Sequence, residues 1–469
     1  MSDKHATLEN RDGFQSKWGF ILACIGSAVG MGNIWRFPIM VQQFGGMTFL
    51  IPYFLFVLLI GSTGIIEEFA LGRWAQGGPV ISFGKATEER TGNKRLGEAI
   101  GALPIVGSMM LAIGYTVVMS WIFKYCWMGI SGSLYAMGTD MATIGGTFGG
   151  TAPEAETLGE ALSMMFGNGI FGIGNGVWLI VGLVASLAIM AFGVGNGIEK
   201  ANKVMMPALF FLFVILGIYI CTLPGASEGY KYIFTLKPEG LLDPMVWVFA
   251  LGQAFFSLSV TGSGMIVYGA YLSPQEDVVG VAQHTALFDT IAAVVAALVI
   301  IPACFSYGLD VGAGPSLLFV TLPTILQDIP LGQLFAVILY IAMIFAGVSS
   351  LQNMFEAVAE SLQHRFPRLS RTATLIILAV LCLGFGIGME TISQWGPWMD
   401  LVSIYIIPIG ATLGAVSWFY VMKKDELLSA INTGSGKTRG RLWYGIGRYL
   451  YVPLAVILCC VALFMKVAF

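Results

Sequence analysis

The stretches GSAVGMGN (residues 26–33) and FSLSVTGSG (residues 256–264) decide the fold of this 469-residue chain. Each lies inside an apolar segment, and each holds several glycines, which weaken a helix by about 1 kcal/mol apiece relative to alanine. Unwound backbone at membrane depth has to be buried in protein or line a cavity. Close helix packing through small residues is the alternative interpretation. The polar residues inside both stretches favour broken helices, whose freed carbonyl and amide groups can bind a ligand.

The composition around these stretches is that of a multi-pass membrane protein with lipid as its surroundings. Hydrophobic residues make up 57% of the chain and charged residues 11%, whereas a soluble domain carries about 25% charged residues. Eleven apolar segments are long enough to span a bilayer. They lie at 19–41, 47–71, 99–129, 175–193, 201–222, 244–272, 282–306, 330–363, 372–389, 397–421 and 446–467. We therefore predict an all-α integral membrane protein with eleven transmembrane helices.

The two breaks fall in the first and the sixth predicted spans, which are equivalent positions in a five-plus-five arrangement. Matched broken spans are the sequence sign of an inverted-repeat secondary transporter. The predicted organisation has four parts. They are an N-terminal segment (1–18), a first five-helix repeat (19–222), a second five-helix repeat (244–421) and an eleventh helix with the C-terminus (446–469).

The placement of positive charge predicts the orientation in the membrane. Most of the 24 Lys and Arg residues fall in segments that share one side if the N-terminus is cytoplasmic, and the stretch from Tyr125 to Glu199 contains none. Because cytoplasmic loops are enriched in Lys and Arg, we expect a cytoplasmic N-terminus and an external C-terminus in the cell's inner (plasma) membrane.

Several other function classes find little support in the chain. There is no basic block suited to nucleic acid, and the seven Cys include no CxxC pair that would indicate a zinc site. The stretch GSGKT (434–438) resembles the end of a phosphate-binding loop, but that loop needs a glycine where Ile431 stands. We see no nucleophile and base arranged for catalysis, so we do not expect an enzyme.

Four motifs resemble those of the neurotransmitter:sodium symporter family. The stretch GSAVGMGNIWRFP (26–38) looks like its first-helix signature, and GQAFFSLS (252–259) resembles its sixth-helix signature. Residues 346–350, AGVSS, resemble its eighth-helix sodium motif, and 318–323, LFVTLP, its fourth external loop. The resemblance is to bacterial members with eleven spans. It implies a LeuT-type fold and sodium-coupled symport of an amino acid by alternating access.

The resemblance implies two sodium sites, built from the oxygen ligands that hard cations prefer. Site one would be formed by Ala28, Asn33, Ser257 and Asp289, completed by the substrate carboxylate. Site two would be formed by Gly26, Val29, Ala346, Ser349 and Ser350. Without the resemblance, the two serines would be interpreted as helix-packing hydroxyls.

Asp289 bears on the use of chloride. Chloride-dependent relatives have Asn at this position and Ser one turn later, where this chain has Asp289 and Ala293. A fixed carboxylate can supply the negative charge that chloride otherwise brings next to sodium. We therefore expect no chloride requirement.

The resemblance also implies an amino-acid site. Gly30 stands where monoamine transporters have Asp, which leaves room for a substrate carboxylate near Tyr115. The full predicted set is Ala28, Gly30, Met31, Gly32, Leu111, Tyr115, Phe256, Ser257, Ser259, Thr261, Gly262, Ser350 and Met354. Gly262 replaces a larger residue of many relatives, so we expect a wide pocket that takes a bulky apolar or aromatic neutral amino acid.

Further residues match the gates of the family. Arg36 is expensive within an apolar span and should face water or an acid such as Asp400. The predicted outer gate is Arg36, Gln253 and Asp400, and the predicted inner gate is Arg11, Phe14 and Tyr271. His364 stands where the acidic partner of the inner gate is usual, and Glu360 is a candidate to replace it. Glu68 matches a family residue that supports the break in the sixth helix.

Two other functions stay open at this point. A sodium-independent amino-acid exchanger could use the same fold, although the oxygen-rich residue sets at both sodium sites argue against it. A substrate-binding sensor on a transporter scaffold is the second alternative. The sequence leaves the identity of the amino acid, the ion stoichiometry and the oligomeric state open.

Overall fold

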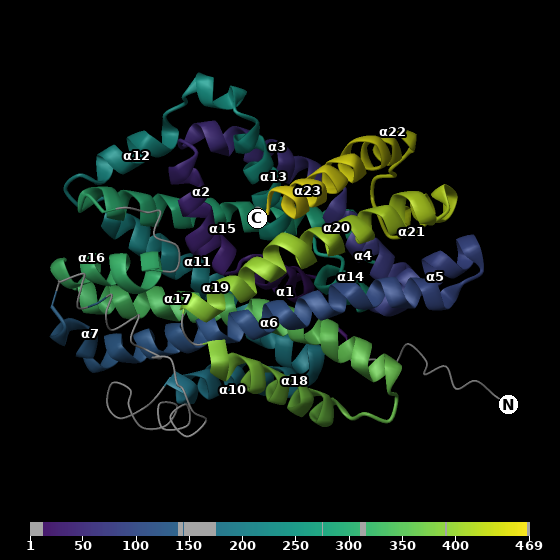
Figure 1. Cartoon of the computed structure of the whole chain (residues 1–469), viewed down its shortest axis with the longest axis horizontal. Coiled ribbons are helices and arrows are strands. Elements are labelled where there is room, and N and C mark those ends of the chain that lie inside the picture. The colour runs from purple at the N-terminus through teal and green to yellow at the C-terminus, as the bar shows by residue number, and fades with distance from the viewer. Residues whose placement is uncertain are drawn as a thin grey trace.

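The computed structural model describes residues 13–138, 144, 175–273, 275–309, 316–389 and 392–466, and every regular element within these ranges is helical. The helices α6 (Lys94–Ser131) and α17 (Gly332–Arg365) pack along each other through the middle of the molecule (Figure 1). The shorter pair α10 (Asn175–Ala191) and α18 (Arg371–Gly386) lies along one side of them. The predicted all-α fold is confirmed.

Apolar helices occur where the sequence predicts spans. Within the described ranges, seven helices are long and apolar enough to cross a membrane. They are Met47–Ala75, Lys94–Ser131, Val194–Ile220, Val278–Ser306, Gly332–Arg365, Gln394–Val421 and Arg441–Met465. The first predicted span is a bent pair, and the remaining three correspond to the shorter helices α10, α13 (Pro244–Ser257) and α18. This pattern is consistent with eleven crossings.

The spans are assembled from individual helices and short π-helical turns. The elements not yet bounded are α3 (Met47–Ser62), α4 (Gly64–Ala75), η4 (Val194–Glu199), α11 (Lys200–Ile220), α15 (Val278–Ser306), α19 (Ile392–Asp400), η8 (Leu401–Ile406), α20 (Ile407–Val416), η9 (Ser417–Val421), α22 (Arg441–Ile446), η10 (Gly447–Tyr451) and α23 (Val452–Met465). The connecting helices are α5 (Pro79–Thr91), α7 (Ser133–Ala136), α12 (Ala226–Phe234), η5 (Pro238–Leu242), η6 (Leu317–Thr321), α16 (Leu322–Asp328), η7 (Ile387–Met389) and α21 (Lys424–Asn432).

The outer surface of the bundle is apolar. On α11, for example, Val204 and Phe211 are 67% and 66% exposed. A soluble protein rarely exposes large contiguous apolar patches, whereas a helix in contact with lipid has to. The outward-facing side chains therefore agree with a bilayer around the bundle.

The first span is broken at the glycine-rich stretch. The helix α1 (Lys17–Ala28) ends at Ala28, and the chain resumes at Gly32 as η2 (Gly32–Arg36) and α2 (Phe37–Gln43), with a bend of 55° between the two halves. The break leaves backbone groups around residues 29–31 outside the regular helical ladder, at the depth where the sequence predicts a binding site.

The sixth span is broken at the second stretch. The helix α13 ends at Ser257, and α14 (Gly264–Ala270) begins only after six residues of irregular backbone. Ser259 and Gly262 have φ angles of 53° and 74° in the left-handed region, which glycine tolerates and serine rarely adopts. The Gly262 N–H donates to Glu68 Oε1 at 2.7 Å, so Glu68 satisfies an amide that the break has freed. The neighbouring Glu67 instead accepts from Tyr451 Oη at 3.4 Å.

Close approaches between backbones fix α14 against α4. A Cβ atom on Gly72 would lie 1.8 Å from the Ile266 carbonyl oxygen, so only glycine fits there. The two helices can therefore touch backbone to backbone, which places the second half of the sixth span beside Glu68 on α4.

Candidate functional site

A small cavity lies between the two breaks. Its volume is about 30 Å³. Residues from α1, α6, α13, α17 and α20 surround it. They are Ser27, Ala28, Gly30, Gly32, Asn33, Leu111, Tyr115, Phe256, Ser259, Thr261, Ser350, Met354 and Ile407. Ten residues of the predicted substrate set are thus brought together, while Ser27 and Ile407 were not predicted.

The polar end of the cavity faces Gly30. A Cβ atom on Gly30 would lie 2.7 Å from Ser350 Oγ and 3.5 Å from Tyr115 Oη. The absence of a side chain at Gly30 therefore leaves two hydroxyl groups facing the unwound backbone. Hydroxyl and backbone N–H groups are suitable donors for a carboxylate. An acidic side chain at this position would occupy the same space.

Three predicted substrate residues lie elsewhere. Met31 lines the neighbouring vestibule, and Ser257 is directed at Asp289. A Cβ atom on Gly262 would lie 2.4 Å from the Gly410 carbonyl oxygen. The idea that Gly262 enlarges the pocket is therefore wrong, because a side chain at this position would point at the α20 backbone. Glycine is needed there for the close approach of α20 and for the positive φ angle.

The predicted residues of sodium site one form a buried polar group next to this cavity. Asn33 Nδ2 donates to Asp289 Oδ1 at 2.7 Å and to the Asp289 carbonyl at 3.2 Å, and Ser257 Oγ donates to Asp289 Oδ2 at 2.6 Å. Because Nδ2 is held by Asp289, the orientation of the Asn33 amide is determined. Its Oδ1 is buried and has no hydrogen-bond partner among the described residues.

This arrangement fits a cation. A buried amide oxygen without a partner costs about 1–3 kcal/mol, and a hard cation bound beside it removes that cost. The carboxylate of Asp289, fully buried between Asn33 and Ser257, supplies negative charge. Ala28, the other predicted ligand from the first span, lines the cavity together with Asn33.

The predicted residues of sodium site two also converge. Ser349 Oγ donates to the Gly26 carbonyl at 2.8 Å and to the Ala346 carbonyl at 2.9 Å. Ser350 Oγ lies 3.3 Å from the same Gly26 oxygen. Val29 is the C-cap residue that directly follows α1. Oxygen atoms of α1 and α17 therefore meet at the first break, which is the chemistry that a sodium ion requires.

A vestibule lies on the other side of Phe256. It has a volume of about 200 Å³, and both Arg36 and Asp400 line it. The Arg36 guanidinium lies 5.0 Å from the centre of the Phe256 ring, in the geometry of a cation–π contact. Gln253 is buried one turn before Phe256 on α13. Phe256 thus separates the small cavity from the vestibule, with Arg36 over it.

At the opposite end, aromatic rings and an ion pair close the bundle. Phe14 packs against Tyr268 and Tyr271 with ring centres 5.5 Å and 6.4 Å apart. Tyr271 Oη donates to Glu356 Oε1 at 2.7 Å, and Arg371 holds the same carboxylate at 3.2 Å and 2.8 Å. The predicted gate residue Arg11 lies outside the described residues.

The carboxylate that meets Tyr271 is therefore Glu356, which the sequence analysis missed. Glu360, the candidate we named, accepts from the Gly78 N–H at 2.9 Å at the turn between α4 and α5. His364 lines a pocket of about 340 Å³ that borders this closure, together with Tyr271, Glu360 and Arg371. Glu356 and Arg371 are 15 positions apart and a loop lies between them, so no local pattern in the sequence pairs them.

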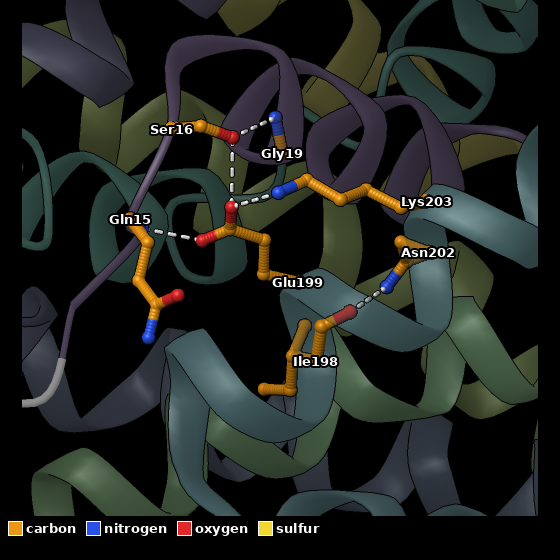
Figure 2. Close-up of polar contacts among 7 residues, drawn as sticks. All are labelled: Gln15, Ser16, Gly19, Ile198, Glu199, Asn202 and Lys203. Carbon is orange, nitrogen blue, oxygen red and sulfur yellow. Dashed lines mark hydrogen bonds and ion pairs between the residues drawn. The ribbon is translucent and has the colours of Figure 1, made fainter.

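A second contact that the sequence analysis missed ties α11 to the start of α1. The carboxylate of Glu199 accepts hydrogen bonds from the Gln15 N–H, from Ser16 Oγ at 2.8 Å and from Lys203 Nζ at 2.6 Å (Figure 2). Ser16 Oγ in turn accepts from the Gly19 N–H at 3.0 Å and caps the helix. We call Gln15, Ser16, Glu199 and Lys203 the α1–α11 latch.

Comparisons with known proteins agree with this geometry. The model of the sodium:neurotransmitter symporter family matches residues 11–139 and 153–468. An uncharacterized sodium-dependent transporter, YhdH of Bacillus subtilis, is 32% identical over 94% of this chain and 95% of its own length. The sodium- and chloride-dependent GABA transporter ine of Drosophila melanogaster is 25% identical over 90% of this chain and 48% of its own length. The crystal structure of MhsT in complex with L-phenylalanine matches with a TM-score of 0.82 and 30% identity, over 96% of this chain and all of that one.

Proposed function

We propose that this chain, which belongs to the sodium:neurotransmitter symporter family, imports a neutral L-amino acid by sodium-coupled symport. Sodium-coupled transport is the activity of the family. The observation that carries the proposal for this chain is the cavity between the two broken helices, with the buried Asn33–Asp289–Ser257 group beside it.

The amino acid that we propose has a bulky apolar or aromatic side chain. Leu111, Phe256, Met354 and Ile407 supply apolar surface to the cavity, and among the described residues no charged side chain lines it. The structural neighbour MhsT is in complex with L-phenylalanine, which supports the same class. Because the volume of about 30 Å³ is too small for such a substrate, flexible Met354 and the Phe256 ring have to rotate when it binds.

The proposed pose places the two charged ends of the amino acid at opposite polar groups. The carboxylate lies near Gly30, where it meets the Tyr115 hydroxyl and the sodium ion of site one. The ammonium group meets carbonyls freed by the break in the sixth span, near Phe256 and Ser259. Sodium and substrate share one site, so each raises the affinity of the other by the same coupling free energy.

We also propose that transport needs no chloride. Asp289 is held against Asn33 and Ser257, and its carboxylate can supply the negative charge that a chloride ion otherwise brings next to sodium. The Drosophila relative, by contrast, bears a name that includes chloride dependence.

Alternating access follows from the two closures. The vestibule with Arg36 and Asp400 is the proposed external entrance, and the Tyr271–Glu356–Arg371 group with the α1–α11 latch is the proposed cytoplasmic closure. This assignment places the N-terminus in the cytoplasm and the C-terminus outside the plasma membrane. Sodium at site two bridges α1 and α17 and holds the cytoplasmic side closed.

Uptake into proteoliposomes tests the proposal. A panel of labelled amino acids is offered under an inward sodium gradient, with choline replacing sodium in the control. We expect sodium-driven accumulation of phenylalanine, tryptophan or leucine, and little of glycine. Equal uptake in choline would instead indicate an exchanger, and sodium-enhanced binding without uptake would indicate a sensor.

A further inference from the structure

Asn202 is a buried amide on α11 that none of the functions above uses. Its side chain is fully buried, and Nδ2 donates to the Ile198 carbonyl at 2.9 Å and to Gln352 Oε1 at 3.1 Å. Figure 2 shows the first of these bonds, one turn from the Glu199 carboxylate. Because a backbone carbonyl can only accept, the nitrogen of the Asn202 amide must face Ile198. The orientation of the amide is therefore determined, and Oδ1 points the other way.

Oδ1 lies against Gly26, a residue of the predicted sodium site two. A Cβ atom on Gly26 would lie 2.2 Å from Asn202 Oδ1 and 3.2 Å from Ser349 Oγ, so both oxygens border the same point on α1. Gly26 and Ser349 are residues of the predicted site. Glycine at position 26 is what allows the α11 amide to come this close.

No hydrogen bond to Asn202 Oδ1 is present among the described residues. Leaving a buried amide oxygen without a partner is unfavourable, and an apolar side chain of the same shape would avoid that cost. Asn33 at site one has the same two features, an Nδ2 held by fixed acceptors and a buried Oδ1 without a partner. Each of the two proposed sodium sites thus borders one amide oxygen of this kind.

We propose that Asn202 supplies its amide oxygen to the sodium ion of site two, as a ligand contributed by α11. This inference rests on the proposed sodium-coupled function. The other ligands of the site come from α1 and α17, so Asn202 makes the ion bridge three helices. Glu199, the last residue of η4, holds the start of α1 just before α11 begins. Loss of the ion therefore loosens the same helix pair that the α1–α11 latch joins.

Equilibrium binding of ²²Na⁺ to the purified full-length chain tests the inference. Two classes of sodium site are expected in the wild type, and site one is the class whose affinity rises when phenylalanine is added. Asn202→Leu keeps the shape of the side chain and removes the oxygen. We expect this variant to lower the sodium affinity of site two, the class that phenylalanine does not affect, by about tenfold or more.

A matched control is available one helix away. Asn353 on α17 is also a buried asparagine, and its Nδ2 donates to the Gly264 carbonyl at 3.2 Å. Asn353→Leu makes the same chemical change outside the site, and both sodium affinities should stay within about threefold of the wild type. If both sodium affinities of Asn202→Leu also stay within about threefold of the wild type, Asn202 is not a ligand of site two.

Asn202→Asp is expected to change the sodium affinity of site two in the opposite direction, toward tighter binding. A carboxylate at the ion strengthens sodium binding at site two. Its second oxygen takes the place of Nδ2 and faces the Ile198 carbonyl whether or not the ion is bound, so this repulsion lowers stability rather than sodium affinity. Gln352 can turn its Nε2 group toward the new oxygen. A purely structural asparagine would show no gain, so unchanged or weaker sodium binding overturns the inference even if Asn202→Leu fails to fold. Absence of any sodium binding in the wild type would instead contradict the proposed function itself.

Discussion

Replacing Asp289 by Asn is the perturbation with the largest expected effect on sodium coupling. The two carboxylate oxygens of Asp289 are held by Asn33 Nδ2 at 2.7 Å and by Ser257 Oγ at 2.6 Å. Asp289→Asn keeps the size of the side chain but removes the negative charge. It also places an NH₂ group beside one of the two donors, and facing Ser257 this group can donate to the hydroxyl, so the hydrogen bond there reverses in direction.

The size of the effect follows from the distance between the charges. A carboxylate about 4 Å from a sodium ion contributes about 4 kcal/mol at an effective dielectric constant of about 20. That energy corresponds to about a thousandfold in sodium affinity. An added anion can restore part of it, so chloride should stimulate the variant although it has no effect on the wild type.

Sodium activation of phenylalanine uptake measures both effects. The sodium concentration for half-maximal uptake is determined in chloride and in gluconate for the wild type, for Asp289→Asn and for Glu67→Gln. The last variant removes a buried carboxyl group that contacts Tyr451 rather than the sodium site. Sodium activation of Asp289→Asn within about threefold of the wild type would refute the assigned role of Asp289, because the charge removed would be worth less than about 1 kcal/mol.

Three further changes probe other parts of the molecule. Gly30→Ala places a methyl group 2.7 Å from Ser350 Oγ. Equilibrium binding of phenylalanine should therefore weaken by at least about tenfold. Unchanged binding would contradict the proposed position of the substrate carboxylate. Glu356→Gln breaks a buried ion pair with Arg371, and breaking such a pair costs about 3–5 kcal/mol. A cysteine introduced at position 14 in place of Phe14 should then react faster with a cytoplasmic thiol reagent. An unchanged reaction rate would exclude Glu356 from the closure. Gly72→Ala puts a Cβ atom 1.8 Å from the Ile266 carbonyl oxygen. This clash should destabilise the fold by about 1–3 kcal/mol or more. A melting temperature equal to that of the wild type would show that α4 and α14 can move apart freely.

The sequence was sufficient to predict the features that depend on local composition. The breaks around Gly30 and Gly262 were predicted because clustered glycines weaken a helix wherever they occur. The apolar segments were predicted because a bilayer requires a minimum length of apolar helix. The sodium-site residues followed from the resemblance to a family, and the contacts of Asn33 and Ser349 show that these residues do come together.

Features that depend on contacts between distant segments could not be predicted in this way. The Glu199 carboxylate binds Gln15 and Ser16 across more than 180 positions of sequence, and no periodicity links these residues. Gly262 was assigned to the pocket because its replacement of a larger residue suggested extra space. Its actual neighbour is the Gly410 backbone, which only the packing of α20 reveals.

Parallel fluxes of ²²Na⁺ and labelled phenylalanine into proteoliposomes test sodium-coupled symport most directly. At a fixed membrane potential, we predict that phenylalanine entry requires sodium and that an additional component of sodium entry requires phenylalanine. The two fluxes should keep a constant ratio as either concentration is varied, and both should be lost together in Asp289→Asn at low sodium. Phenylalanine entry that continues without sodium, or sodium entry that phenylalanine does not change, would contradict symport.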